Sequence, residues 1–210
     1  MLNKNDFKAY SCIALLGGTF NPVHKGHIAM AECALRQKKD IEKLVFMPNA
    51  KTYYKDGSGV VSGDLRLRML DAAVGGNPAF DVTDIEVRRG GYTLTVDTLN
   101  ELKNINPNLK IYFIIGADSL FYFDKWVRYE EILELSNVLV ASRESSREEL
   151  EQKRDDIVKK SGLNSIELLD FEEVDASSTA IRAMIKQGEN PGDMLPDGVY
   201  DIIMENGLYR

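Results

Sequence analysis

The fold of this chain is decided by the stretch Leu16-Gly17-Gly18-Thr19-Phe20-Asn21-Pro22-Val23-His24-Lys25-Gly26-His27. An apolar run from Cys12 to Leu16 precedes it and predicts a buried strand, and residues 28–35 follow it with helical spacing. Three glycines, one proline and the two histidines of the chain lie between these elements. The stretch therefore predicts a strand, a tight turn and a helix in succession.

The turn has the composition of an anion-binding site. Gly17 and Gly18 permit a ligand to approach the backbone closely. The helix after Gly26 would direct its N-terminal N–H groups and its positive dipole end toward the turn. His24 and His27 are three residues apart at the helix start, so they can lie close together and stabilise negative charge on phosphate oxygens. Two surface histidines in a glycine-rich turn are the alternative at this point.

Other common sites fit this spacing poorly. The turn lacks the Gly-Lys-Ser/Thr of a Walker A loop and the Gly-x-Gly-x-x-Gly of a dinucleotide-binding fingerprint. A zinc site built on the two histidines alone would lack ligands. Cys12 and Cys33 lie in apolar segments, so we expect buried thiols in a reducing compartment, and neither a disulfide nor a metal site.

A second helix start with similar chemistry is predicted in Asp175-Ala176-Ser177-Ser178-Thr179-Ala180-Ile181-Arg182. Ser177 or Ser178 can cap a helix, and their hydroxyls together with N-terminal N–H groups can bind an anion. Arg182 lies about one turn further along, where its guanidinium could reach a phosphate. Taken alone, this stretch is better explained as an ordinary capped helix with a surface arginine.

Strand-like and helix-like segments alternate along the chain. The predicted strands are residues 11–17, 43–48, 80–87, 110–116, 137–142 and 166–169, and the predicted helices are 26–37, 62–74, 95–103, 129–135, 146–161, 178–186 and 198–205. Most of the strands are apolar on both faces. This predicts an α/β, Rossmann-like doubly wound fold with a mainly parallel sheet and helices on both faces. We also expect a turn or bulge near Asp84 and a loop over residues 88–94.

Ligands of such sheets bind at the carboxyl ends of the strands. The loops after Leu16, Met47, Ile115 and Val140 should therefore meet at one edge. The candidate chemistry lies largely in these loops, which supports the predicted architecture.

Composition limits the function further. The 210 residues are 44% hydrophobic and 28% charged, with a net charge of −7, which disfavours a broad nucleic-acid-binding face. Residues 1–10 contain no apolar core, so we expect no signal peptide. No segment approaches the roughly 20 apolar residues of a membrane helix. We therefore expect a soluble cytoplasmic protein with neither a membrane nor a nucleic-acid partner.

The opening stretch resembles the signature of the nucleotidyltransferase superfamily with the T/HxGH motif. The longer form, Gly-Gly-Thr-Phe-Asp/Asn-Pro-x-His-x-Gly-His, is similar to that of the bacterial nicotinate-nucleotide adenylyltransferases. The resemblance implies that residues 1–210 form a single nucleotidyltransferase domain. It further implies catalytic roles for His24 and His27, and an ATP-binding turn that consists of these histidines with Gly17, Gly18, Thr19 and Phe20.

The second helix start is similar to the family's Ile-Ser-Ser-Thr-x-Ile-Arg motif, which closes over the ATP phosphates. The resemblance assigns ATP binding to Ser177, Ser178, Thr179 and Arg182. Ala176 stands where the family has isoleucine, a departure that should not affect phosphate contact.

Two segments between these motifs resemble acceptor-binding segments of the family. Gly116-Ala117-Asp118-Ser119 and Trp126 match a segment in which the tryptophan stacks on the nicotinate ring. Trp126 is the one tryptophan of the chain, and a packing role is the alternative for it. Asp118 would contact ribose or a metal-bound water. Thr95 would lie near the nicotinate carboxylate, while Leu94 replaces the family's tyrosine.

The loop from Pro48 to Lys55 departs most from the family pattern. Only its first and last residues match, and Tyr53 and Tyr54 replace a Pro-His pair. The resemblance leaves Lys51 or Lys55 to contact the mononucleotide phosphate, and a solvated loop is the alternative for both lysines.

The implied activity is adenylyl transfer from ATP to nicotinate mononucleotide, which gives deamido-NAD and pyrophosphate in NAD biosynthesis. Mg²⁺ would bridge phosphate oxygens without ligands from protein side chains. One alternative is a sister adenylyltransferase that uses nicotinamide mononucleotide or phosphopantetheine, and another is a non-catalytic nucleotide-binding sensor. The sequence leaves open whether the chain forms a homo-oligomer.

Overall fold

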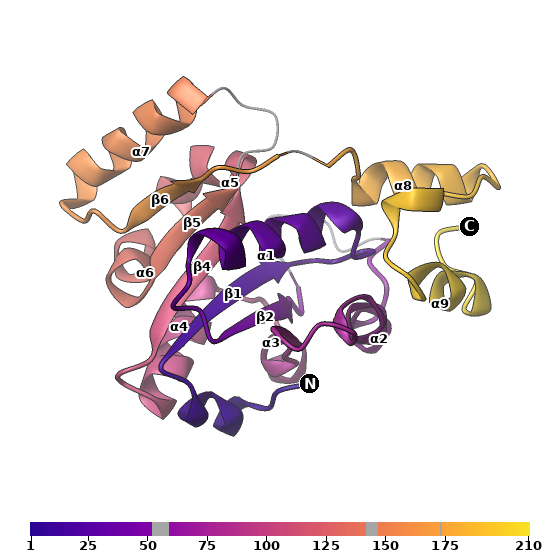
Figure 1. The fold of residues 1–210 in the computed structure, drawn as a ribbon, viewed down its shortest axis with the longest axis horizontal. Helices are drawn as coiled ribbons and strands as arrows, with labels where there is room; N and C mark the ends of the chain where they lie inside the picture. The colour runs from indigo at the N-terminus through magenta and orange to yellow at the C-terminus, as the bar shows by residue number, and fades with distance from the viewer. Residues whose placement is uncertain (52–58, 142–146, 173) are drawn as a thin grey trace.

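A single sheet of six parallel strands forms the centre of the molecule (Figure 1). The computed structural model describes residues 1–51, 59–141, 147–172 and 174–210. The strands lie in the order β3-β2-β1-β4-β5-β6, which is the order of a doubly wound Rossmann-like fold. Their bounds are β1 Cys12–Gly18, β2 Lys43–Pro48, β3 Phe80–Val82, β4 Lys110–Gly116, β5 Asn137–Ala141 and β6 Ile166–Leu169. The predicted fold class is confirmed.

Helices connect these strands and continue beyond the last one. The α-helices within the described residues are α1 Lys25–Gln37, α2 Gly63–Val74, α3 Ile85–Arg89, α4 Thr95–Ile105, α5 Ala117–Phe121, α6 Tyr129–Leu135, α7 Arg147–Ser161, α8 Ser178–Lys186 and α9 Val199–Glu205. Short 3-10 helices are η1 Lys4–Ala9, η2 Phe123–Lys125 and η3 Gly192–Met194. In the part of the chain that the structure describes, no helix has the length and apolar character needed to cross a membrane.

Alternating side chains of the strands divide the interior into two cores. Along β1, Ile13 and Leu15 join one core together with residues of α4, α5, α6 and α7. Ala14 and Leu16 join the other core, with residues of α1, α2, α8 and α9. Because both faces of the sheet are covered, the central strands β1, β2, β4 and β5 are apolar over most of their length, which is why their runs are visible in the sequence.

The prediction for residues 80–94 is wrong in two respects. The strand ends at Val82, and residues 85–89 form α3 where a strand end and a loop were expected. Asp84 precedes this helix and forms an ion pair with Arg88, four residues later. Ile85 packs into the core beside α4. A helix of little more than one turn is too short to display its period, so the alternation of apolar residues was misleading.

A buried acidic residue connects α3 to α4. Glu86 is only 3% exposed and accepts a hydrogen bond of 2.7 Å from the hydroxyl of Thr98. Arg89 lies 3.7 Å from the same carboxylate and also pairs with Glu101 at 3.2 Å. Burial raises the pKa of Glu86 to about 7, against the opposing effects of Thr98 and Arg89.

Glu86 should make the stability of the protein depend on pH. Its pKa is near 4.5 in the unfolded chain and about 7 in the folded protein, so the folded state binds the proton more tightly. The free energy of unfolding should therefore fall as pH rises from about 5 to 8. In Glu86→Gln, the fall in the free energy of unfolding between these pH values should be smaller than in the wild type by on the order of 1–3 kcal/mol. Urea denaturation at each pH measures this difference.

Glu205→Gln is the matched control, because Glu205 is an exposed carboxylate that is solvated in both states. It should leave the decrease unchanged. An equal decrease in the wild type and in Glu86→Gln would contradict the prediction.

Candidate functional site

The ends of neighbouring strands bring the predicted loops to one edge of the sheet. Gly18 of β1 lies opposite Pro48 of β2, and Gly116 of β4 lies opposite Ala141 of β5. The strands are parallel, so the chain leaves all four at the same edge. The loop after β5 begins with residues 142–146, which lie outside the described residues. For the loops after β1, β2 and β4 the predicted convergence is confirmed.

The turn after β1 folds around a buried aromatic ring. Phe20 is 1% exposed and has a left-handed backbone with φ of 49°. Its ring lies against Gly18, where a Cβ atom would be 3.0 Å from it, so a larger residue at that position would require the ring to move. The ring also packs on those of His27 and Phe46, with centroid distances of 4.9 and 6.0 Å. Phe20 is therefore covered by its neighbours on all sides.

The two histidines stack at the start of α1. His24 precedes the helix and is 5% exposed, and its ring centroid lies 3.7 Å from that of His27. The backbone N–H of His24 donates to Nδ1 of His27 at 3.2 Å. Because Nδ1 accepts this bond, the proton of a neutral His27 lies on Nε2, which makes Nε2 the hydrogen-bond donor. A Cβ at Gly26 would lie 3.0 Å from the ring of His24, so a larger residue there would press on this imidazole.

A buried arginine supports the turn from the other side. Arg66 of α2 is 2% exposed and donates to the carbonyl oxygens of Thr19, at 2.9 Å, and Val61, at 3.1 Å. The backbone N–H of Asn49, just after β2, donates to the carbonyl of Gly18 at 3.0 Å. The loop between β2 and α2 therefore holds the turn at both of its ends, through Asn49 after β2 and through Arg66 of α2.

The start of α8 lies directly against this turn (Figure 1). Ser177 is the cap of the helix, and its hydroxyl accepts a bond of 3.1 Å from the N–H of Ala180. Ser178 instead donates its hydroxyl to the carbonyl of Pro22 at 2.8 Å. The structure therefore assigns different positions to the two serines, which the sequence left as alternatives for the cap.

Arg182 makes the second contact between α8 and the turn. Its Nη1 donates to the carbonyl of Asn21 at 2.8 Å, and its Nη2 donates to the hydroxyl of Thr179 at 3.3 Å. Two helix starts that are about 150 residues apart in the sequence are thereby held face to face.

Asn21 and Tyr209 also belong to this site, although neither was predicted as a site residue. Asn21 is 5% exposed, and its Oδ1 accepts bonds from the hydroxyl of Tyr209, at 2.8 Å, and from the N–H of Val61, at 3.2 Å. Its amide nitrogen donates to the carbonyl of Gly59 at 3.0 Å. Burial raises the pKa of Tyr209, so this phenol remains a proton donor. No local pattern links Tyr209, next to the C-terminus, to a turn near the N-terminus.

The predicted acceptor residues lie on neighbouring elements. Thr95 is the first residue of α4, and Leu94, just before it, packs against the core. Trp126 is partly buried, with its ring centroid 5.3 Å from that of Phe123 and 6.3 Å from that of Phe113. The ring therefore has a packing role, which does not exclude an exposed edge or face for a ligand.

The remaining acceptor candidates are exposed where they are described. Asp118 is exposed in the first turn of α5, and Lys51 is exposed just after β2. The carbonyl of Lys51 accepts a bond of 3.0 Å from the N–H of Thr93, which ties this loop to the segment before α4. Lys55, with the two tyrosines before it, lies outside the described residues.

No cluster of three or more His, Cys, Asp or Glu side chains that could hold a metal ion occurs in the described residues. The groups at the junction of the turn and α8 are mainly hydroxyls, imidazoles, a guanidinium and helix N-termini, which are suited to anions. A metal ion there would need ligands from a bound phosphate and water.

The parallel doubly wound sheet and the two helix starts that meet at its carboxyl edge are features of nucleotide-binding enzymes, and the relatives of the chain place it in the nucleotidyltransferase class. The family described as Cytidylyltransferase-like matches residues 15–184, and the chain belongs to it. Within this class the chain is a member of the nicotinate-nucleotide adenylyltransferase family, as its relatives show.

Two of these relatives carry the name "Probable nicotinate-nucleotide adenylyltransferase". The protein of Clostridium acetobutylicum is 35% identical over 198 residues, which cover 93% of this chain and 98% of the relative. The protein of Desulfitobacterium hafniense is 38% identical over 200 residues, with 94% and 95% covered. The predicted resemblance is therefore confirmed for nearly the whole chain.

Solved structures agree on the fold. The nicotinic acid mononucleotide adenylyltransferase of Plasmodium falciparum complexed with NaAD has a TM-score of 0.75 and 17% identity, covering 94% of this chain and 97% of that one. The same enzyme complexed with APC has a TM-score of 0.73, with 94% and 96% covered.

Replacement of Arg66 should weaken both the fold and the turn. Arg66→Met fills a similar volume but leaves two buried carbonyl oxygens without their charged donor. The free energy of unfolding should fall by about 2–4 kcal/mol in urea denaturation. Arg68→Met is the matched control, since this side chain is 56% exposed on the same helix, and it should change stability by less than about 0.5 kcal/mol. Equal effects of the two variants would contradict the structural role.

Proposed function

We propose that this chain transfers the adenylyl group of ATP to nicotinate mononucleotide, which gives deamido-NAD and pyrophosphate in NAD biosynthesis. The observation that carries the proposal is the direct contact of the α8 start with the histidine turn, through Ser178 and Arg182. One polyphosphate chain could contact both anion-binding helix starts at once. We also propose that residues 1–210 act as one nucleotidyltransferase domain.

The turn is proposed to bind the phosphates next to the reacting centre. ATP would come close to the backbone at Gly17, Gly18 and Thr19. The N-terminus of α1 would stabilise the negative charge of the phosphates. His24 and His27 would hydrogen-bond the phosphates. The Nε2–H of His27 is the better donor for the charge that develops on the transferred group, since Nδ1 is already used by the backbone.

The start of α8 is proposed to bind the β- and γ-phosphates. Ser177, Ser178 and Thr179 supply hydroxyl and backbone groups in its first turn. Arg182 has five N–H donors, of which the contacts with the Asn21 carbonyl and with Thr179 use two. The remaining donors could bind phosphate oxygens.

The reaction needs positioning more than proton transfer. A phosphate oxygen of the mononucleotide forms a bond to the α-phosphorus, while the bond from that phosphorus to the bridging oxygen of the β-phosphate breaks. Pyrophosphate leaves with the electron pair. A phosphomonoester has its second pKa near 6, so the nucleophile is already ionised at neutral pH and no general base is required. ATP would enter as its Mg²⁺ complex, with the ion held by phosphate oxygens and water.

The acceptor is proposed to lie between α4 and the segment after β4. Trp126 would stack on the nicotinate ring, and Thr95 at the start of α4 would lie near its carboxylate. Asp118 would contact the ribose or a metal-bound water. Lys51, with Lys55, would contact the mononucleotide phosphate.

One assay tests the proposal against its alternatives. The protein is supplied with MgATP and, in turn, with nicotinate mononucleotide, nicotinamide mononucleotide or phosphopantetheine, and pyrophosphate release is measured. We expect the highest kcat/KM with nicotinate mononucleotide. Preference for another acceptor would indicate a sister adenylyltransferase, and no release with any of them would favour a nucleotide-binding sensor.

The distal nitrogen of His27 should account for much of the rate. His27→Asn can still accept the backbone bond near the Nδ1 position but loses the distal donor, and it should lower kcat by about 10²–10³-fold. His27→Gln places an amide nitrogen near the position of Nε2 and should retain more activity. Steady-state kinetics and thermal unfolding separate these effects from misfolding. Near-normal turnover of a folded His27→Asn variant would contradict the electrostatic role.

Trp126 should contribute to acceptor binding in addition to packing. Trp126→Ala should raise the KM for nicotinate mononucleotide by about 5- to 100-fold, the range expected for loss of aromatic stacking on a base. The KM for ATP serves as the internal control and should change little. Trp126→Phe keeps a ring and should have the smaller effect. An unchanged KM for the mononucleotide would show that Trp126 only packs.

A further inference from the structure

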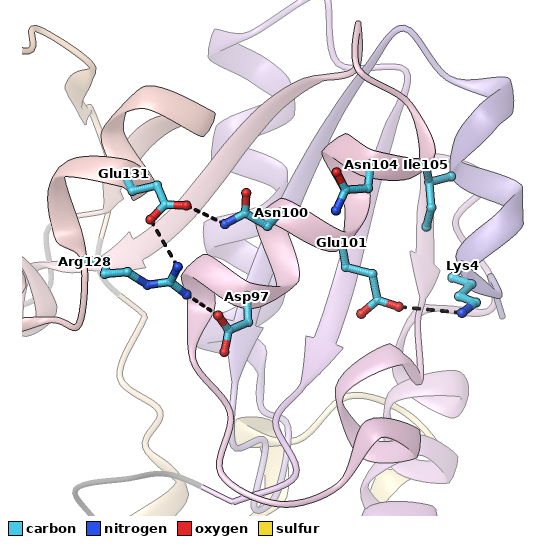
Figure 2. Close-up of a pocket in the computed structure, with 8 residues that line it drawn as sticks. All are labelled: Lys4, Asp97, Asn100, Glu101, Asn104, Ile105, Arg128 and Glu131. Atoms are coloured by element: carbon cyan, nitrogen blue, oxygen red, sulfur yellow. Dashed lines mark hydrogen bonds and ion pairs between the residues drawn. The ribbon is translucent and has the colours of Figure 1, made fainter.

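A pocket of about 580 Å³ lies along α4 and is lined by residues of η1, of α4 and of the start of α6 (Figure 2). Charged and amide side chains line it, and several of them pair with one another. Four of these residues form a continuous network between the starts of α4 and α6, and we call them the α4–α6 bridge: Asp97, Asn100, Arg128 and Glu131.

Arg128 is the central residue of the α4–α6 bridge. Its Nη2 is hydrogen-bonded to a carboxylate oxygen of Asp97, and its Nη1 lies 3.3 Å from a carboxylate oxygen of Glu131. The other oxygen of Glu131 accepts a bond of 2.6 Å from the amide of Asn100. Figure 2 shows these side chains pointing toward one another from the two helices.

The backbone of Arg128 has an unfavourable conformation. Its φ and ψ are 55° and 45°, the left-handed region that residues with a Cβ rarely adopt. Such a conformation persists only when the surroundings determine it, and it occurs frequently at functional sites. The Asp97 pair does little to offset this cost, because the two side chains are about half exposed and exposed ion pairs contribute little to stability. We therefore relate the bridge to the relative position of the segments that it joins, and not to the stability of the fold.

The position of the α4–α6 bridge connects it to the proposed acceptor site. Asp97 is two residues after Thr95, in the first turn of α4, and Arg128 is two residues after Trp126. The bridge thus joins the two segments that would bind the nicotinate group from opposite sides. We propose that Arg128 is a positioning residue that holds Trp126 at a fixed distance from the start of α4 and so sets the width of the acceptor pocket. This inference rests on the proposed function.

Fluorescence gives a readout of this geometry that does not depend on activity. Trp126 is the one tryptophan of the chain, so emission excited where tyrosine does not absorb reports on its surroundings alone. Arg128→Gln and Asp97→Asn should each raise the acrylamide quenching constant of Trp126 about twofold. The double variant should resemble each single one, because residues of one pair are not additive.

Kinetics then test the consequence for the acceptor. Each variant should raise the KM for nicotinate mononucleotide about 5- to 20-fold and leave the KM for ATP within twofold. Arg128→Gly removes the side chain while fitting the left-handed backbone, so it should raise the KM equally without loss of thermal stability. Lys4→Ala is the matched control. It breaks the pair between Lys4 of η1 and Glu101 of α4, at 3.9 Å, in the same pocket, and should change neither quenching nor KM.

Unchanged quenching in the folded variants would overturn the inference, as would changed quenching with an unchanged KM for the mononucleotide. Equal effects of Lys4→Ala on quenching and on KM would also overturn it, because loss of any ion pair along α4 would then have the same consequence. Failure of the proposed function has a different signature: the wild-type protein would release no pyrophosphate with any acceptor, whatever the quenching results.

Discussion

The donation of two hydrogen bonds from α8 to the turn after β1 is the interaction on which the site depends. Ser178 and Arg182 bind the carbonyl oxygens of Pro22 and Asn21, both at 2.8 Å. These contacts connect helix starts from opposite ends of the chain. Each helix start presents N-terminal N–H groups, and the two together form the binding site that we propose for an extended chain of phosphates.

The sheet makes this contact feasible because its two faces are filled by different helices. The core on one side includes residues of α1, α2, α8 and α9, so the two helices whose starts meet at the turn lie on the same face. The core on the other side includes residues of α4, α5 and α6. Of the proposed acceptor residues, Thr95 lies on α4, Asp118 on α5 and Trp126 between α5 and α6, and the α4–α6 bridge joins α4 to the start of α6. The proposed donor and acceptor sites therefore meet across the carboxyl edge of the strands, where the strand order reverses direction.

Most of the fold could be predicted because long apolar runs are visible in a local window. The β4 strand and α8 have the predicted bounds, while the single turn of α3 was mistaken for a strand end. The family resemblance is confirmed, and the functions of individual residues stay predictions. Arg66, Asn21 and Tyr209 were not predicted as site residues, because their partners are backbone carbonyls and side chains far away in the sequence.

The sequence by itself determined the parallel α/β architecture, the glycine and histidine turn, and the capped second helix start, since each depends on local spacing and composition. Only the tertiary structure decided that these two starts contact one another, that the ring of Phe20 lies inside the turn, and that Arg128 reaches Asp97. The physical reason is that such contacts depend on where buried faces place the helices, which no local pattern specifies. The turn after β1 thus has the composition proposed for a phosphate site, and packing places the start of α8 against it.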